Sequence, residues 1–147
     1  MKNHRIHFLV LGLTAIVFLG ACSSVALPLT GADRDKVLAY SESKTDNLMQ
    51  AINGNDYAAF SRDLNDAMKN AIPNDGLANM RTKVNGKIGN YVARQVSSVL
   101  QTGNDIAVIY LAKFESDDAV TMRVVFEAAE PHRISGLWFD SAKLRQQ

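Results

Sequence analysis

The chain has 147 residues, of which 47% are hydrophobic and 21% are charged, and its formal net charge at pH 7 is +1. This balance excludes a disordered tail or a low-complexity scaffold, both of which lack the apolar residues that a core needs. Charges of both signs are interspersed, so no basic stripe indicates nucleic-acid binding. The single cysteine excludes an internal disulfide, and we expect one domain that its own core stabilises.

The N-terminus has the layout of a secretory signal. Lys2 and Arg5 give a basic start, and an apolar run follows over Phe8–Gly20. A charged start, an apolar middle and small residues before a cut are typical of signal peptides. The alternative is an uncleaved anchor, but a spanning helix needs roughly 20 apolar residues and this run is shorter. We therefore expect residues 1–21 to be a signal peptide.

The end of the run, Leu19-Gly20-Ala21-Cys22, resembles the lipobox of bacterial lipoproteins. The resemblance implies that Cys22 receives a diacylglyceryl group, and that a further acyl chain such as palmitate joins the new amino terminus. One acyl chain holds a protein only marginally, whereas two or three anchor it stably. Membrane lipid is therefore the expected partner of Cys22, and the domain would lie in the cell envelope, facing away from the cytoplasm. In such lipoproteins a serine after the cysteine, here Ser23, favours the outer over the inner membrane where both exist.

Residues 22–32 are expected to form a tether and residues 33–147 the folded domain. Apolar residues at steps of three and four predict a helix over residues 33–52, which Gly54 ends. The same spacing predicts a second helix from Asn55 or Asp56 to Pro73. A third, weaker helix follows Asn74 and ends near residue 89.

The hydrophobic period then changes to two, which is typical of strands. Short links between these strands favour antiparallel neighbours in a meander. The predicted fold class is α+β, with two to three N-terminal helices packed on a curved four-stranded antiparallel sheet. A frayed tail is expected over Ser141–Gln147. The four strands are predicted over residues 91–100, 106–114, 120–128 and 133–140.

Over Lys36 to Phe139 the chain resembles the nuclear transport factor 2-like, or cystatin-like, α+β roll. Within that superfamily it is similar to a family of uncharacterised domains found as bacterial and archaeal lipoproteins, or fused ahead of α/β-hydrolase domains. The resemblance implies a fold and no particular reaction. It rests on the helix junction Ala51–Phe60, the following Leu64 and Met68, Gly86-Lys87-Ile88-Gly89, and the closing Arg133–Phe139.

Residues for catalysis or metal binding are sparse. The strand face expected to point inward carries Val120, Met122, Val124 and Phe126, and no acid or base. His132 lies in a predicted turn, where an ordinary exposed histidine is favoured over a catalytic one. Asp56 suits a helix N-cap better than a pocket acid. We expect no enzyme activity, no metal and no cofactor.

Two further groups of residues have alternative roles. Aromatic side chains could line a cavity between helices and sheet, although core packing is favoured. The strand over residues 106–114 is apolar on both faces, which predicts a homodimer or protein partner on the outer sheet face through Ile109, Leu111 and Val125. The aromatic candidates for cavity lining are Tyr40, Tyr57, Phe60, Tyr110 and Trp138.

The leading functional hypothesis is a membrane-anchored, non-catalytic binding or interaction module outside the cytoplasm. The alternatives are a small-molecule-binding or enzymatic cavity domain, and an accessory domain that partners an envelope hydrolase.

Overall fold

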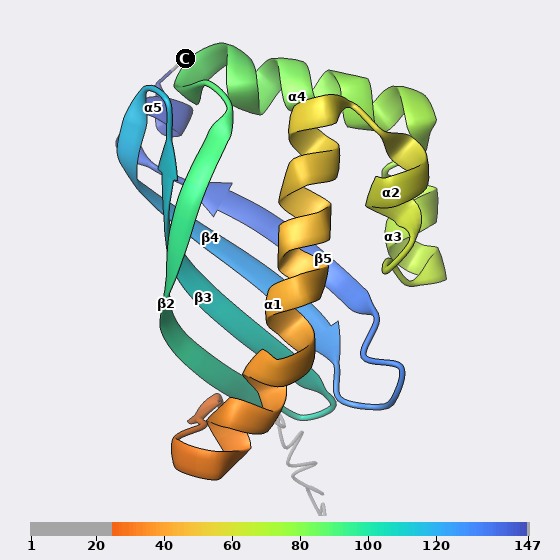
Figure 1. Cartoon of the computed structure of the whole chain (residues 1–147), viewed down its shortest axis with the longest axis vertical. Coiled ribbons are helices and arrows are strands. Elements are labelled where there is room, and N and C mark those ends of the chain that lie inside the picture. The colour runs from red at the N-terminus through yellow and green to blue at the C-terminus, as the bar shows by residue number, and fades with distance from the viewer. Residues whose placement is uncertain (1–24, 147) are drawn as a thin grey trace, which may run out of the picture.

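The longest helix, α1, runs from Gly31 to Gly54 and crosses one face of the sheet (Figure 1). Its buried side chains recur at helical spacing, among them Val37, Leu48 and Ile52. The helix ends where Asn55 adopts a left-handed conformation (φ 53°) and its N–H returns to the last turn. The first predicted helix is therefore confirmed, with about two more residues at each end.

The second predicted helix is two helices, α2 (Tyr57–Ser61) and α3 (Asp66–Ala71). The chain leaves helical geometry between them because it pairs with the last strand: Asn65 N donates to Ile134 O at 3.0 Å, and Ile134 N donates to Asp63 O at 2.8 Å. The Asn65 side chain then starts α3 by accepting a hydrogen bond from Met68 N at 2.9 Å. A hydrophobic pattern does not encode this pairing between segments far apart in the sequence. The prediction of one continuous helix is therefore wrong.

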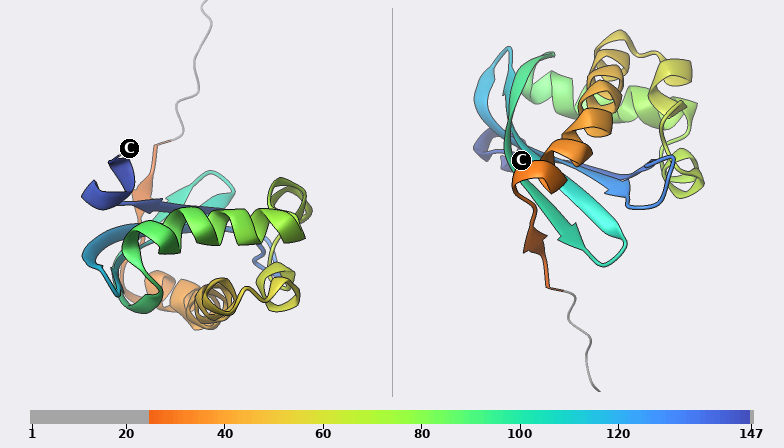
Figure 2. Two further views of the ribbon diagram at one scale, coloured as in Figure 1. Left: turned by 90° about the horizontal axis from the view of Figure 1, so that it is seen from above. Right: turned by 60° about the horizontal axis from the view of Figure 1, so that its bottom comes forward.

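Helix α4 (Asn74–Ile88) follows Pro73, as predicted, and lies over one end of the sheet (Figure 2). It stops at Gly89, whose φ of 82° favours glycine. A Cβ atom at Gly89 would also lie 2.7 Å from Cβ of Glu115, so the site excludes a larger residue.

The sheet has five antiparallel strands in chain order, not the four predicted. The additional strand pairs Leu27 with Gln101 and Pro28 with Leu100, within the segment expected to be only a tether. A proline fits there because an edge strand leaves one side of its backbone unpaired. The strands are β1 (Leu27–Pro28), β2 (Tyr91–Thr102), β3 (Asp105–Phe114), β4 (Asp117–Glu127) and β5 (Ile134–Asp140).

The computed structural model describes residues 25–146, so the expected signal peptide 1–21 and Cys22 lie outside the described residues. The end of the chain differs from the frayed tail predicted there. Ser141 caps a short helix, α5 (Ala142–Arg145), by accepting a hydrogen bond from Leu144 N at 3.2 Å.

The two faces of the sheet differ as the alternating pattern predicted. The inward residues of β4 are fully buried, and they face α1: Val120, Met122, Val124 and Phe126. The opposite, outer face carries Ile109, Leu111 and Val125. Leu111 there is 41% exposed, whereas Val125 is only 5% exposed.

Candidate functional site

A hollow of about 480 Å³ opens at the end of the sheet where β1 enters the domain. We call it the tether-end hollow. Segments far apart in the chain meet there: β1 and the start of α1, the β2–β3 turn region, and the turn between β4 and β5 (Figure 2). Its lining combines apolar side chains with a few polar ones, which is the usual composition of small-molecule sites. The lining residues are Leu29, Asp33, Lys36, Val37, Tyr40, Gln101, Ile106, Ala128 and His132.

Two flat rings form one wall of the tether-end hollow. The rings of Tyr40 and His132 stack with centroids 3.9 Å apart and planes 11° apart. The rings of Phe126 and Tyr40 pack edge to face, with centroids 5.7 Å apart. This contact holds the tyrosine ring against the core. The Tyr40 hydroxyl is buried without a hydrogen-bond partner among residues 25–146, and burial raises the pKa of Tyr40.

The turn that carries His132 is tied to α1. Lys44 Nζ donates to the carbonyl of His132 at 2.9 Å and also to that of Pro131. His132 itself has a positive φ of 54°. Its Nδ1 is 3.2 Å from the carbonyl oxygen of Glu127, and because a carbonyl only accepts, Nδ1 must donate. In the neutral imidazole Nε2 is then an acceptor, so this wall can receive a hydrogen bond.

The remaining lining of the hollow divides by polarity. Leu29, Val37 and Ile106 supply apolar surface, and Ile106 and Val37 are buried core residues. Asp33 and Lys36 form an exposed ion pair at 3.2 Å. An exposed pair of this kind contributes little to stability, so Lys36 can turn toward an incoming acidic or polar group at small cost.

A second polar cluster, which we call the Arg94 cluster, joins α1 to the inner face of the sheet. The Arg94 side chain is 6% exposed. Its guanidinium donates to Glu42 Oε2 at 3.2 Å and to Asp46, and lies 5.1 Å from the ring centroid of Tyr110. The Tyr110 hydroxyl donates to Glu42 Oε1 at 2.8 Å and lies 3.2 Å from Thr45 Oγ1.

The environment of the Arg94 cluster shifts two pKa values. Burial alone would lower the pKa of Arg94, but hydrogen bonds with Asp46 and Tyr91 and the charge of Glu42 raise it overall. Burial raises the pKa of Tyr110 to about 12, and the Glu42 carboxylate adds to that effect. Both groups therefore keep their ordinary protonation at neutral pH. The cluster is a network in which the Arg94 guanidinium and the two carboxylates are already engaged with one another.

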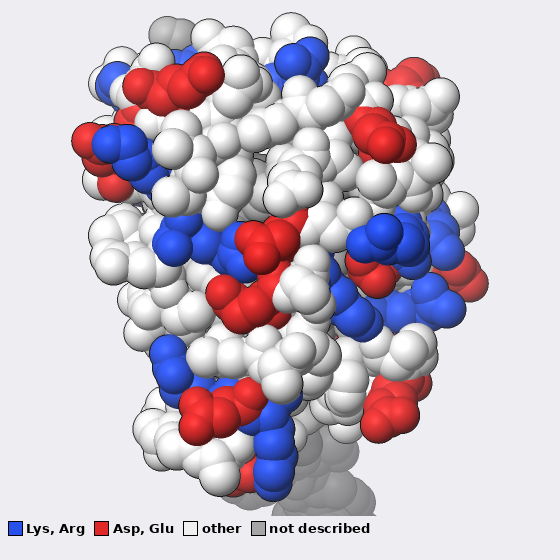
Figure 3. Space-filling view, in the orientation of Figure 1, with Lys and Arg blue, Asp and Glu red and all other residues white. Residues whose placement is uncertain are grey.

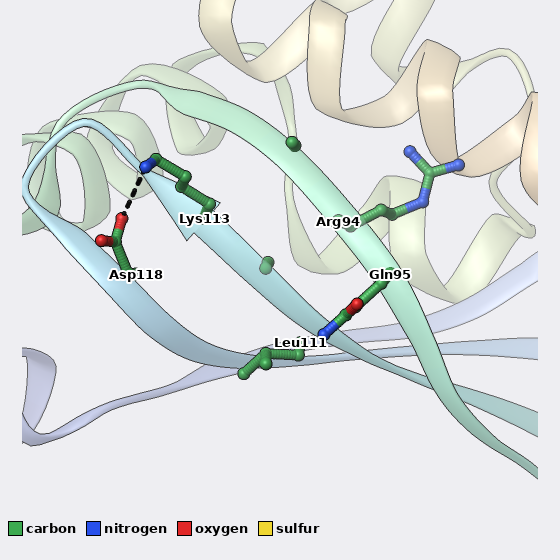
Figure 4. Close-up of a pocket in the computed structure, with 7 residues that line it drawn as sticks. Arg94, Gln95, Leu111, Lys113 and Asp118 are labelled. Carbon is green, nitrogen blue, oxygen red and sulfur yellow. Dashed lines mark ion pairs between the residues drawn. The ribbon is translucent and has the colours of Figure 1, made fainter.

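Figure 4 shows that neighbouring residues of β2 point to opposite faces of the sheet. Arg94 extends toward α1, whereas Gln95 and Leu111 belong to a shallow hollow of about 220 Å³ between β2 and β3. Lys113 and Asp118 pair across that region at 3.2 Å. Acidic and basic side chains are interspersed over the face seen in Figure 3, so no strongly charged patch forms on it.

The structure separates the five aromatic residues predicted to line a cavity. Tyr40 lines the tether-end hollow, and Tyr110 is buried in the Arg94 cluster. The ring centroids of Tyr57 and Phe60 are 6.2 Å apart, and Phe60 is fully buried in the core. Trp138 is 52% exposed on the outer face of the sheet. It therefore does not line a cavity between the helices and the sheet, as predicted for it. It pairs across strands with Arg123, which lies on the outer face of β4.

Sequence reasoning missed two features of this region. His132 is half-buried against Tyr40, not an ordinary exposed histidine. Arg94 was missed because its inward position depends on the β2–β3 register, in which Arg94 faces Ala112 and Val96 faces Tyr110. The alternation of β2 itself, Arg94 and Val96 against Ala93 and Gln95, was the available signal.

Asp56 acts as predicted, capping α2 by accepting a hydrogen bond from Ala59 N at 3.1 Å. Within the described residues, no cluster of three or more His, Cys, Asp or Glu side chains is placed to hold a metal ion. The described helices include none that is both long and apolar enough to span a membrane.

Comparison with known proteins gives one match. The sequence pattern of DUF3887, a family described as proteins of unknown function, matches residues 45–137. The chain therefore belongs to this family. No curated protein and no solved structure matches the chain.

Proposed function

We propose that this member of the DUF3887 family is a lipid-anchored, non-catalytic binding module of the cell envelope. Its ligand site would be the tether-end hollow, and the ligand a small molecule with an apolar body and a polar end. The observation that carries the proposal is the wall of stacked Tyr40 and His132 beside the apolar side chains of Leu29, Val37 and Ile106. A preformed, mostly apolar hollow with few polar groups is the usual form of such a site.

A non-catalytic role is proposed because the carboxylates of the Arg94 cluster are already engaged. Glu42 accepts hydrogen bonds from Arg94 and Tyr110, and Asp46 pairs with Arg94. A general acid or base needs to reach the proton that it transfers to or from the substrate. The engagement of these carboxylates supports a structural role for them.

The fold is proposed to be a nuclear transport factor 2-like roll. A long helix lying in the curve of an antiparallel sheet supports this proposal. The lipid anchor rests on the lipobox-like Leu19–Cys22, and Ser23 favours an outer membrane. Acylated Cys22 would hold the domain beside the membrane, with the ligand hollow near the lipid because β1 and the hollow share one end of the domain.

The hollow is tested with a matched pair of substitutions. Ala128 lines the hollow, whereas its neighbour Ala129 is exposed outside it. The probe is 1-anilinonaphthalene-8-sulfonate, whose fluorescence rises in apolar sites. We expect Ala128→Phe to fill the hollow and abolish the rise, and Ala129→Phe to leave it unchanged. Equal fluorescence in both variants, with circular dichroism showing both folded, would contradict the proposal.

The anchor is tested by mass spectrometry of the mature protein and by membrane fractionation. We expect a wild-type mass that begins at Cys22 and includes a diacylglyceryl group and an acyl chain. Cys22→Ser should lose the lipid mass and move to the soluble fraction. A wild-type protein that begins at Met1 without lipid would refute the anchor while leaving the hollow proposal intact.

A second candidate function is partner binding through the outer sheet face. The observation that favours it is Leu111, a large aliphatic side chain that is 41% exposed and lies two residues from Ile109 on the same face of β3. The partner would be a second copy or another envelope protein, such as a hydrolase that the domain assists. Light scattering of the delipidated domain at high concentration should show a dimer that Leu111→Asp dissociates. A wild-type monomer removes the self-pairing version.

A further inference from the structure

Trp138 lies on the outer sheet face, where Gly136 leaves room for its indole ring. It is 52% exposed, and it is the single tryptophan of the chain. Its ring lies against the strand above Gly136, where an added Cβ would collide with the ring atoms Cζ3 and Cη2. Gly136 is itself buried because the indole covers it. A glycine at this position therefore lets the indole lie on the sheet as a supported aromatic surface.

The Arg123 guanidinium lies over the indole ring of Trp138 in a cation–π contact. Arg123 is the cross-strand neighbour of Trp138, and its guanidinium carbon is 4.9 Å from the indole centroid. Within residues 25–146, Arg123 is in no ion pair. Arg123 is also exposed, so its planar donors can reach a ligand acid without first breaking a salt bridge.

The two side chains border a hollow of about 250 Å³, which we call the Trp138 hollow. Ala107 and Val125 form its apolar floor, 8% and 5% exposed. Ser135 Oγ donates to Asp105 Oδ1 at 3.4 Å on the rim, and Thr102 adds a second hydroxyl. The hollow thus joins an aromatic surface, a guanidinium that forms no ion pair within residues 25–146, a carboxylate and hydroxyl groups over an apolar base.

We propose that the Trp138 hollow binds a saccharide ring that carries a carboxylate. A sugar ring has a face of C–H bonds that packs on an aromatic surface, and a rim of hydroxyl groups that need partners. Arg123 would pair with the sugar carboxylate in a charge-assisted contact. Asp105 would accept from ring hydroxyls. This site lies on the opposite face of the sheet from Tyr40, so it does not depend on the tether-end hollow.

The single tryptophan makes the test direct, because all tryptophan emission comes from this site. Glucuronic acid and glucose differ mainly in the carboxylate, and both are titrated at matched ionic strength. We expect glucuronic acid to change the emission with an affinity about tenfold higher than that of glucose, the effect of one charge-assisted contact. Arg123→Gln should remove that preference, whereas Arg62→Gln, also an exposed arginine but far from the hollow, should preserve it.

Nuclear magnetic resonance titration of Trp138→Leu, whose melting confirms that it folds, should show no shifts with either sugar. Three outcomes would overturn the proposal. They are no response to glucuronic acid, an equal response to glucose, or emission that changes with protein concentration alone, which would identify a self-association surface instead.

Discussion

Tyr110 is a buried phenol whose titration reports on the Arg94 cluster. Burial and the neighbouring Glu42 raise its pKa to about 12 from an ordinary value of 10.0. Burial also raises the pKa of Tyr40, so the component that belongs to Tyr110 is identified by substitution. We expect a component that ionises about two pH units late when phenolate absorbance of the four tyrosines is followed during alkaline titration, and Tyr110→Phe to remove it. Ionisation of all four tyrosines near pH 10 would contradict this assignment.

The raised pKa of Tyr110 also determines how the stability of the domain depends on pH. Because the folded pKa lies above the unfolded one, the stabilisation is fully present below pH 10 and is lost as pH rises from 10 to 12. Two pKa units correspond to about 3 kcal/mol. Urea unfolding of Tyr110→Phe should therefore depend less steeply on pH over that range than unfolding of the wild type.

At the scale of elements, Arg94 joins α1 to β2 through buried contacts. Arg94→Ala removes its hydrogen bonds to Glu42 and Asp46 and its contact with the Tyr110 ring. The carboxylates left behind are half exposed and water can solvate them, so we expect a loss of about 2–3 kcal/mol in the free energy of unfolding, below the full cost of an isolated buried charge.

Arg62→Ala is the matched control for this element-scale prediction. Arg62 pairs with Asp63 at 3.5 Å, but its side chain is 63% exposed, so its removal should change the unfolding free energy by less than about 0.5 kcal/mol. Both are measured by urea denaturation. Equal small effects of the two substitutions would mean that Arg94 does not join the elements.

The helices and strands also show which parts of the fold a sequence pattern can predict. Three of the four main strands were predicted from a hydrophobic period of two, and the strand over residues 106–114 from an apolar run on both faces. Helices α1 and α4 followed from helical spacing, and each of these patterns is local. The break between α2 and α3 was not visible, since it arises from backbone bonds of Asn65 and Asp63 to Ile134. β1 was missed for the same reason: two residues carry no period, and only their pairing with Leu100 and Gln101 defines the strand.

At the scale of the whole molecule, the candidate site was the least predictable part. Tyr40 was selected from the sequence as a cavity residue, but its partner His132 is 92 positions away and was assigned to an exposed turn. Their stacking requires the register of β4 with β5 and the position of α1 over the sheet. A site assembled from distant segments cannot be derived until those placements are known.

If Cys22 is lipidated, the domain also has a defined orientation relative to the membrane. β1 and the turn between β4 and β5 lie at one end of the domain, and α4 with α5 at the other (Figure 1). That turn contains His132. Cys22 is three residues from Val25, which at full extension spans about 10 Å. We therefore expect lipid nanodiscs with spin-labelled headgroups to broaden amide resonances of Leu27 and His132 most strongly, and those of Lys87 least. Cys22→Ser mixed with the same nanodiscs should show no broadening, and stronger broadening at Lys87 than at His132 would reverse the proposed orientation.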